Sequence, residues 1–367
     1  MPQPYVYFYL PQSLWPDDLP DDVSLNWPGF GLGVYAWTVQ TYLRLRDAGL
    51  SCALVNYLPS EGIVFLHRNT FRNHRSGIEM SPKRLLVCFQ GDLPPHPDAQ
   101  IHIVQNRTQH QLKTSLIPNW LWKQVEESHQ LGAYFMPHWP QPGLRPREIA
   151  RGNRFTTIAF FGHTTNLAPE LSGTAWGEAL DNLGLQWRPV INTNQWNKHQ
   201  TLDVRWDDYG SVDAIVAVRT FDKRALAQAN YYQHKPATKL YNAWLAGVPA
   251  ILGVESGYRA ERQNSLDYIE AQSLAEVLQA LVQLKEDHDL RQAMINHGRA
   301  KAQAVSPEKL TQRWLRFVQD TLLPLYEIWC RQSPLQQQLV RYHNHLSYGA
   351  QRLQERFHNW QYSLNQD

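Results

Sequence analysis

The 367-residue sequence has few cysteines and no long apolar run, and these absences exclude several classes of protein. Its three cysteines, Cys52, Cys88 and Cys330, are far apart and odd in number, so they suit neither a metal-binding spacing nor a disulfide framework. We therefore expect a reducing, cytoplasmic location. No stretch of about 18 apolar residues occurs, so no membrane span is expected. No lysine or arginine precedes Arg44, so no secretory signal is expected either.

An excess of charge of either sign is also missing. There are 35 lysines and arginines against 33 acidic residues, a net charge of +2, which argues against a dedicated nucleic-acid binder. The motifs of P-loop nucleotide binding, zinc peptidases and serine hydrolases are absent. The only Asp-x-Asp, Asp287-His288-Asp289, lies in a charged helical stretch and not after a strand, so no metal site is expected. Apolar residues make up 43% of the chain, enough for a packed core.

The first part of the chain alternates strands and helices. Tyr5–Leu10 is short, aromatic and apolar, which predicts a buried strand. A glycine loop, residues 26–33, leads into a predicted helix over Val34–Ala48 and a second strand over Ser51–Asn56. Further apolar strands are predicted at Arg84–Phe89 and Ile101–Val104. Strand, loop, helix, strand is the beginning of a βαβ unit.

Prolines and glycines then interrupt the pattern over residues 137–154, which predicts a linker. Strand patterns resume at Thr156–Phe161, Trp187–Ile191 and Ala214–Val218. The fold class is therefore α/β, with two doubly wound Rossmann-like domains facing a cleft and a C-terminal helical extension. We place an N-terminal domain at 1–140, a second at 155–305, and helices at 306–367 that pack back on the N-terminal domain or dimerise.

Residues 234–259 form the most informative segment. Lys235 and Lys239 stand at the start of a predicted helix, followed by Ala246-Gly247-Val248-Pro249, a short strand, and a loop at Glu255–Tyr258. Cations and unpaired amides at a helix start suit a phosphate. Arg219, which ends the strand before this segment, is a further candidate, because ligands of such sheets bind beyond the carboxyl ends of the strands.

The order of helix, Ala-Gly-x-Pro, strand and glycine loop in residues 234–259 resembles the donor-binding segment of GT-B glycosyltransferases. The wider resemblance to this two-domain family covers residues 1–320. In the retaining branch a pair of glutamates lies eight positions apart, and here those positions are His234 and Asn242. The fucosyltransferase-like branch begins its helix Thr-Glu-Lys-Leu, whereas this chain has Ala237-Thr238-Lys239-Leu240. The sequence thus resembles the superfamily and matches neither branch in full.

The resemblance implies a nucleotide-sugar donor, UDP- or GDP-linked, with no cofactor. Glu255 or Asn242 would hold ribose hydroxyls, the amides of the loop at 255–258 would bind phosphate, and Gly31 and Gly33 would line the cleft. The expected binding residues are Arg219, Lys235, Thr238, Lys239, Asn242, Glu255, Ser256, Gly257, Tyr258, Gly31 and Gly33. Solvated charges and an ordinary strand-to-helix turn remain alternative interpretations of the same residues.

A catalytic base needs a carboxylate or imidazole within reach of the acceptor hydroxyl. Asp92 follows a strand of the first domain and His163 follows the first strand of the second, so both are candidates. Each also has a structural interpretation, as a turn former or a hydrogen-bonding loop residue. His138, in the linker, is a weaker candidate of the same kind.

The sequence therefore predicts a metal-independent glycosyltransferase that transfers a hexosyl or deoxyhexosyl group to a carbohydrate or lipid-linked acceptor. Two enzymatic alternatives share the scaffold, a nucleotide-sugar epimerase and a phosphorylase. A non-catalytic carbohydrate-binding or scaffolding relative is the alternative from another class. Arginines and aromatic residues in the last helix leave peripheral membrane contact open.

Overall fold

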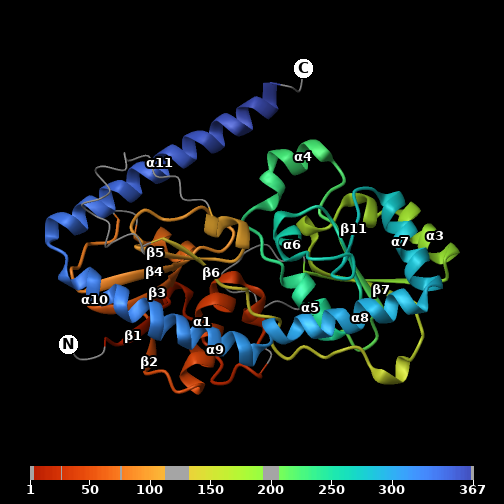
Figure 1. The fold of residues 1–367 in the computed structure, drawn as a ribbon, viewed down its shortest axis with the longest axis horizontal. Coiled ribbons are helices and arrows are strands. Elements are labelled where there is room, and N and C mark those ends of the chain that lie inside the picture. Colours follow the sequence, from red (N-terminus) through yellow and green to blue (C-terminus); the bar gives the residue numbers. More distant parts are fainter. Residues whose placement is uncertain (1–3, 26, 75–76, 112–131, 193–205, 365–367) are drawn as a thin grey trace. The chain divides into compact units, whose positions relative to one another are not determined.

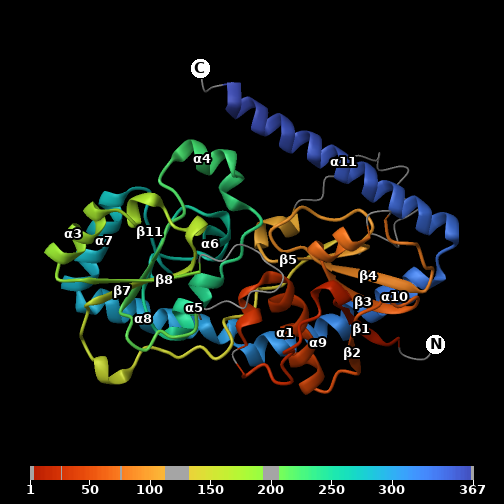
Figure 2. The ribbon, with the colours of Figure 1, turned by 180° about the vertical axis from the view of Figure 1, so that it is seen from behind.

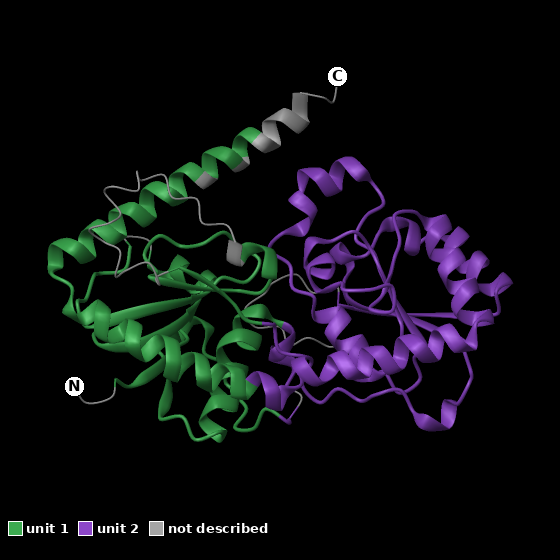
Figure 3. Ribbon diagram, viewed as in Figure 1, with its two compact units in different colours: residues 1–23, 32–136, 311–367 green, residues 24–31, 137–310 purple. Residues whose placement is uncertain are grey.

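The computed structural model describes residues 4–25, 27–74, 77–111, 132–192 and 206–364. Two predicted features, Asn26 of the glycine loop and the side chain of Trp360, lie outside the described parts. The chain forms two compact units (Figure 3). Unit 1 comprises residues 1–23, 32–136 and 311–367, and unit 2 comprises residues 24–31 and 137–310.

Unit 1 is built on a parallel sheet of six strands in the order β2-β1-β3-β4-β5-β6. Its strands are β1 (Val6–Tyr9), β2 (Cys52–Val55), β3 (Gly62–His67), β4 (Arg84–Phe89), β5 (Ile101–Val104) and β6 (Ala133–Phe135). The two central strands are buried at every residue, as expected for a parallel sheet covered on both faces.

One face of this sheet is covered by helices from both ends of the chain (Figures 1 and 2). Helix α1 (Gly33–Asp47) follows β1, and α9 (Pro307–Phe317) returns to the unit near the C-terminus. Trp314 of α9 is fully buried and lies 5.9 Å from the ring of Phe89, 6.0 Å from Phe65 and 6.4 Å from Trp37 of α1. These rings build an aromatic core between the sheet and both helices.

The last helices also belong to unit 1. A π-helical turn, Val318–Leu322, joins α9 to α10 (Leu323–Arg331), just before Pro324, whose ring disturbs regular α-helical hydrogen bonding. Helix α11 (Pro334–Leu364) follows. Buried Asp98 accepts hydrogen bonds from Arg341 at 2.9 Å and His345 at 3.1 Å, and these contacts fix the first half of α11 to the unit.

Unit 2 contains a second parallel sheet, in the order β11-β10-β9-β7-β8. Its strands are β7 (Thr157–His163), β8 (Gln186–Asn192), β9 (Ala214–Ala217), β10 (Ala250–Leu252) and β11 (Ile269–Glu270). Its helices are α3 (Thr174–Asn182), α4 (Lys223–Gln228), α5 (Thr238–Ala246), α6 (Ser256–Glu261), α7 (Leu274–Glu286) and α8 (His288–Ala302). Two parallel sheets with helices between their strands confirm the predicted class of two Rossmann-like α/β domains.

The proline-rich segment 137–154 belongs to unit 2 and is held there by a buried carboxylate. Asp213, just before β9, accepts hydrogen bonds from Arg147 at 3.0 Å and from Arg151 at 2.9 and 2.5 Å. The backbone amides of Thr156 and Thr157 donate to the same carboxylate at 2.8 and 2.9 Å. The segment is therefore anchored to the sheet by side chains that its proline and glycine content does not reveal.

Candidate functional site

Three predicted cations of unit 2 lie near the carboxyl ends of β7 and β9. Arg219 follows β9, Lys239 is the second residue of α5, and Lys235 precedes that helix. All three act on the imidazole of His163, the last residue of β7. Burial lowers the pKa of His163, and the charges of Lys239, Lys235 and Arg219 lower it further, against a hydrogen bond with the Asn192 backbone. The fold thus brings Arg219, Lys235 and Lys239 close to His163, and these residues form one electropositive cluster.

The start of helix α5 differs from the prediction. The helix begins at Thr238, so Lys235 lies outside it, in a turn where its N–H donates to the Tyr232 carbonyl at 2.8 Å. Lys239 lies over the face of Phe160 in β7, with its Nζ 5.6 Å from the ring centre. The hydroxyl oxygen of Thr238 is buried and has no hydrogen-bond partner among the described residues. An unpaired buried hydroxyl of this kind is costly unless a ligand or water satisfies it.

Arg219 is held by a buried ion pair that sequence reasoning did not foresee. Its Nε donates to Glu255 Oε1 at 2.9 Å, and the two side chains expose only 8% and 3% of their surface. The guanidinium also contacts Asn166 and lies 5.2 Å from the centre of the Tyr232 ring. The second carboxylate oxygen, Glu255 Oε2, is buried and has no partner in the described parts of the chain. A carboxylate oxygen in that state is an open acceptor for a hydroxyl donor.

The predicted phosphate-binding loop at 255–258 is the first turn of a helix. Glu255 is the N-cap of α6, and Ser256, Gly257 and Tyr258 are its first three residues. The expectation of a free loop was therefore wrong, because the chain enters a helix directly after the turn that follows β10. Tyr258 is fully buried in the core of unit 2, and burial raises its pKa well above the ordinary value.

Asn242, the other predicted ribose contact, is engaged within unit 2. Its Oδ1 accepts the Gln141 backbone N–H at 3.0 Å, and its side chain hydrogen-bonds to Tyr209. It is 6% exposed. These contacts connect α5 to segment 137–154, so the structure gives Asn242 a structural role beside the predicted one.

In unit 1, Asp92 lies at the carboxyl ends of the strands, as predicted. It is exposed, and its Oδ1 accepts a hydrogen bond from Gln105 Nε2 at 2.8 Å. Gln105 Oε1 in turn accepts from the indole N–H of Trp37 at 3.1 Å. This chain of contacts orients a carboxylate that remains open to solvent.

Gly33, Gly91 and one missed histidine, His67, lie at the same strand ends. Gly33 begins α1, and a Cβ there would meet His67 Nε2 at 3.8 Å. At Gly91, which has φ +60°, a Cβ would come within 2.9 Å of the same nitrogen, so only glycine fits. Gly31 ends a 3₁₀ turn that belongs to unit 2. His67 was not among the sequence candidates, because a histidine at the end of an apolar run carries no motif.

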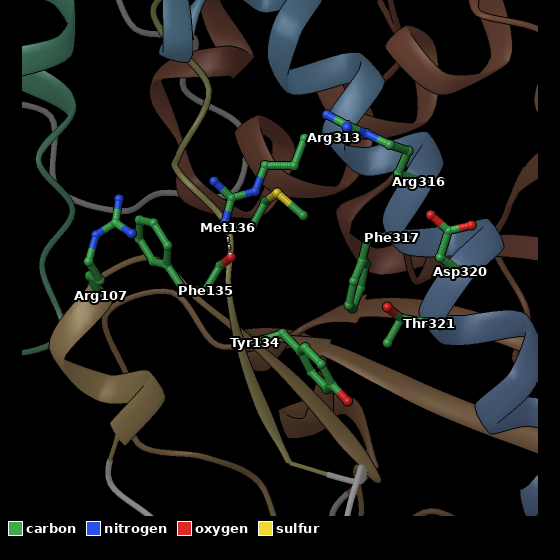
Figure 4. Close-up of a pocket in the computed structure, with 9 residues that line it drawn as sticks. All are labelled: Arg107, Tyr134, Phe135, Met136, Arg313, Arg316, Phe317, Asp320 and Thr321. Carbon is green, nitrogen blue, oxygen red and sulfur yellow. Dashed lines mark hydrogen bonds between the residues drawn. The ribbon is translucent and has the colours of Figure 1, made fainter. Parts of the chain in front are cut away.

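Unit 1 also contains a cavity of about 450 Å³ beside the edge strand β6 (Figure 4). It is lined by Arg107, Tyr134, Phe135, Met136, Arg313, Arg316, Phe317, Asp320 and Thr321. Arg107 and Arg313 both lie over the Phe135 ring, 4.5 and 5.3 Å from its centre, and Arg313 donates to the Phe135 carbonyl at 2.8 Å. The cavity combines aromatic walls with positive charge, a lining suited to an acidic or phosphorylated group.

Within the described ranges there is no cluster of three or more histidine, cysteine or acidic side chains arranged to hold a metal ion. No helix among them is long and apolar enough to cross a bilayer.

Comparison with solved structures assigns the architecture. Sucrose-phosphate synthase from Thermosynechococcus elongatus superposes with a TM-score of 0.54 at 9% identity, covering 88% of this chain and all of that one. The chain has the GT-B fold. The GT-B protein HepE of Anabaena, in complex with UDP and glucose, gives a TM-score of 0.46 at 10% identity over 86% of this chain and all of that one. The glycosyltransferase AviGT4 of avilamycin A biosynthesis gives 0.45 at 13% identity, over 89% of this chain and 98% of that one. The sequence itself matches no known family and no curated protein.

Proposed function

We propose that this GT-B protein is a metal-independent glycosyltransferase whose unit 2 binds a UDP- or GDP-linked sugar. The observation that carries the proposal is the combination, in one place, of a cationic cluster and an open acceptor. Arg219, Lys235 and Lys239 all lie near His163, and Glu255 offers a buried oxygen that has no partner among the described residues. A nucleoside diphosphate has the complementary groups, two phosphates and a ribose diol.

The cluster supplies what a diphosphate leaving group needs. Negative charge grows on the diphosphate as the glycosidic bond breaks, and fixed cations stabilise that charge without reorganising. Lys239, over Phe160, and Arg219, oriented by Glu255, are held in place before the donor arrives. His163 has a lowered pKa, so it is neutral near pH 7 and able to donate one hydrogen bond or accept one.

Unit 1 is proposed to bind the acceptor, a carbohydrate or a lipid-linked sugar. Asp92 is the candidate base, since its carboxylate is exposed and is oriented by Gln105. Because Gly33 and Gly91 have no side chains, the space beside His67 Nε2 is left for an acceptor group. The cavity lined by Arg107, which follows Gln105 by two residues, is the place where an acidic group of the acceptor would bind.

The test is a thermal-shift panel of UDP, GDP, ADP, TDP and CMP on wild type, Lys239→Ala and a matched control. Lys223→Ala removes an equal charge from the exposed first turn of α4. Ligand at about a hundred times its dissociation constant adds roughly 2.7 kcal/mol to the free energy of unfolding. One nucleotide should stabilise wild type and Lys223→Ala, and stabilise Lys239→Ala much less.

The outcomes separate the proposal from its alternatives. Stabilisation by no nucleotide would overturn it in favour of a non-catalytic relative, whose best support is the structural engagement of Asn242 with Gln141. If a nucleotide binds, incubation with the matching nucleotide sugar follows, with and without EDTA. Isomerised sugar or sugar 1-phosphate formed without an acceptor would instead identify an epimerase or a phosphorylase.

A further inference from the structure

Helix α11 has one buried face and, opposite to it, one exposed apolar face. One face packs on unit 1, where Gln337 and Val340 are buried and Gln337 Nε2 donates to the Pro82 carbonyl at 3.1 Å. The other face carries large apolar side chains that expose between 49% and 66% of their surface: Leu335, Leu339, Tyr342, Leu346, Leu353 and Phe357. We call these six residues the α11 stripe.

The spacing of the α11 stripe is that of a helix-pairing seam. Its members are separated by four, three, four, seven and four positions, and at 3.6 residues per turn they fall within about 60° of arc. A helix that buries a face in a core shows an apolar arc of about 100° or more, whereas the narrower stripe is typical of a coiled-coil seam. Gly349 lies in the seven-residue gap, and no atom of the described residues lies within 4 Å of a Cβ built there. A second helix can approach closely at that point.

The exposed area is sufficient for a specific interface. Aromatic side chains bury about 150–250 Å² each and leucine is somewhat smaller, so these six residues, which expose between 49% and 66% of their surface, offer on the order of 600 Å² per copy. Two copies would bury on the order of 1,200 Å², the lower end of stable protein interfaces. An apolar patch of this size on a monomer generally marks an interaction surface.

The charges beside the α11 stripe select the partner. Arg352 and Arg356 lie on one flank, and the nearby Arg341 is already paired with Asp98 of unit 1. The other flank carries uncharged residues such as Ser347 and Gln354. Two parallel copies would place each arginine flank against the neutral flank of its partner, while antiparallel copies would bring arginines together. A lipid surface favours a broad apolar face with basic residues along the polar side, and here that side packs on unit 1.

We propose that α11 pairs in parallel with α11 of a second copy of this chain, through the α11 stripe. The interface uses residues outside the candidate transferase site, so the proposal stands or falls independently of the proposed function.

The test is the mass of the full chain by sedimentation velocity, at concentrations up to about 100 µM. Wild type should approach twice the chain mass of 42.6 kDa. Leu346→Glu and Leu353→Glu should each be monomeric, because a charge in the seam has no partner. Gln354→Glu adds the same charge outside the stripe and should remain dimeric. Circular dichroism should show equal helix content in all four proteins.

Cross-linking tests the orientation, in a background with Cys330→Ser. Leu339→Cys and Leu353→Cys should each form a disulfide between identical chains, because parallel helices place equal positions side by side. A monomeric wild type, or dimers that survive both glutamate substitutions, would overturn the proposal. Co-sedimentation of a monomer with anionic vesicles, lost in the glutamate variants, would overturn it in favour of a lipid surface.

Discussion

The buried pair of Arg219 and Glu255 allows the proposed nucleotide site to be tested at a single atom. Glu255 Oε1 accepts from Arg219 at 2.9 Å, whereas Oε2 is buried with no partner within the described residues. If a ribose hydroxyl donates to Oε2, Glu255→Gln replaces a charged acceptor by a neutral amide. Hydrogen bonds to charged groups contribute about 1.5–3 kcal/mol, which corresponds to a loss of about 10–150-fold in affinity.

The substitution also tests the ion pair. Removing one partner of a buried pair costs up to about 3–5 kcal/mol, and glutamine should cost less because its carbonyl still accepts from Arg219. That loss lies within the total stability of an ordinary domain, about 5–15 kcal/mol, so the variant should fold. Glu270→Gln is the matched control, since Glu270 pairs with Arg259, which is half exposed, at 2.7 Å in the same unit. The control should keep nucleotide affinity and lose little stability.

The assay is isothermal titration of the stabilising nucleotide and of its 2′-deoxy and 3′-deoxy forms. Wild type should bind one deoxy form about 10–150-fold more weakly than the ribonucleotide. Glu255→Gln should bind the two with nearly equal affinity, because the acceptor that distinguishes them is gone. Equal binding of all three nucleotides by wild type would refute the assignment of Glu255 to the ribose.

Two further predictions concern titration in unit 2. Burial alone would raise the pKa of Asp213, but the hydrogen bonds from Arg151, Thr156 and Thr157 and the charge of Arg147 outweigh it and leave the pKa lowered. Ionised Asp213 therefore stabilises the fold above the usual aspartate pKa of about 4, and this stabilisation is lost as pH falls through the folded-state pKa. The free energy of unfolding in urea should therefore change less between pH 7 and pH 3 in Asp213→Asn than in wild type. For His163, whose pKa is lowered by burial and then by Lys239, Lys239→Met should raise the pKa measured by NMR, and binding of a nucleoside diphosphate should raise it in wild type. A His163 pKa that moves in neither experiment would place the phosphates elsewhere.

Local patterns in the sequence predicted much of the fold. Apolar runs such as Arg84–Phe89 became strands buried on both faces, and the helices predicted over 306–367 begin with α9 at Pro307. These features depend on spacing and capping, which neighbouring residues set by themselves. The Ala-Gly-x-Pro segment predicted the end of α5 before β10, which Gly247 makes at φ +68°, whereas the GT-B fold was expected only from the resemblance of residues 234–259 to a known donor-binding segment.

The candidate site was predictable only in part. Arg219 and His163 were each predicted at the carboxyl end of a strand, where ligands of such sheets bind, but the sequence did not predict that they and Lys239 are neighbours. Nothing in the sequence indicated that Arg219 would pair with Glu255, or that Asn242 would bind Gln141, because partners 36 and 101 positions apart are chosen by packing. The same holds for His67. Only the structure shows that its imidazole lies where a side chain at Gly33 or Gly91 would otherwise be.

The sequence by itself determined the repeated strand–helix pattern, the turn after α5 and the apolar stripe of α11, since each follows from periodicity and backbone preference within a few turns of chain. Only the tertiary structure decided which charges are neutralised. Asp213 and Glu255 are both buried carboxylates. Asp213 accepts hydrogen bonds from two arginines and two backbone amides, whereas Glu255 Oε2 has no hydrogen-bond partner among the described residues. That difference depends on the arrangement of distant backbone around each group, which a linear pattern of residue types does not specify.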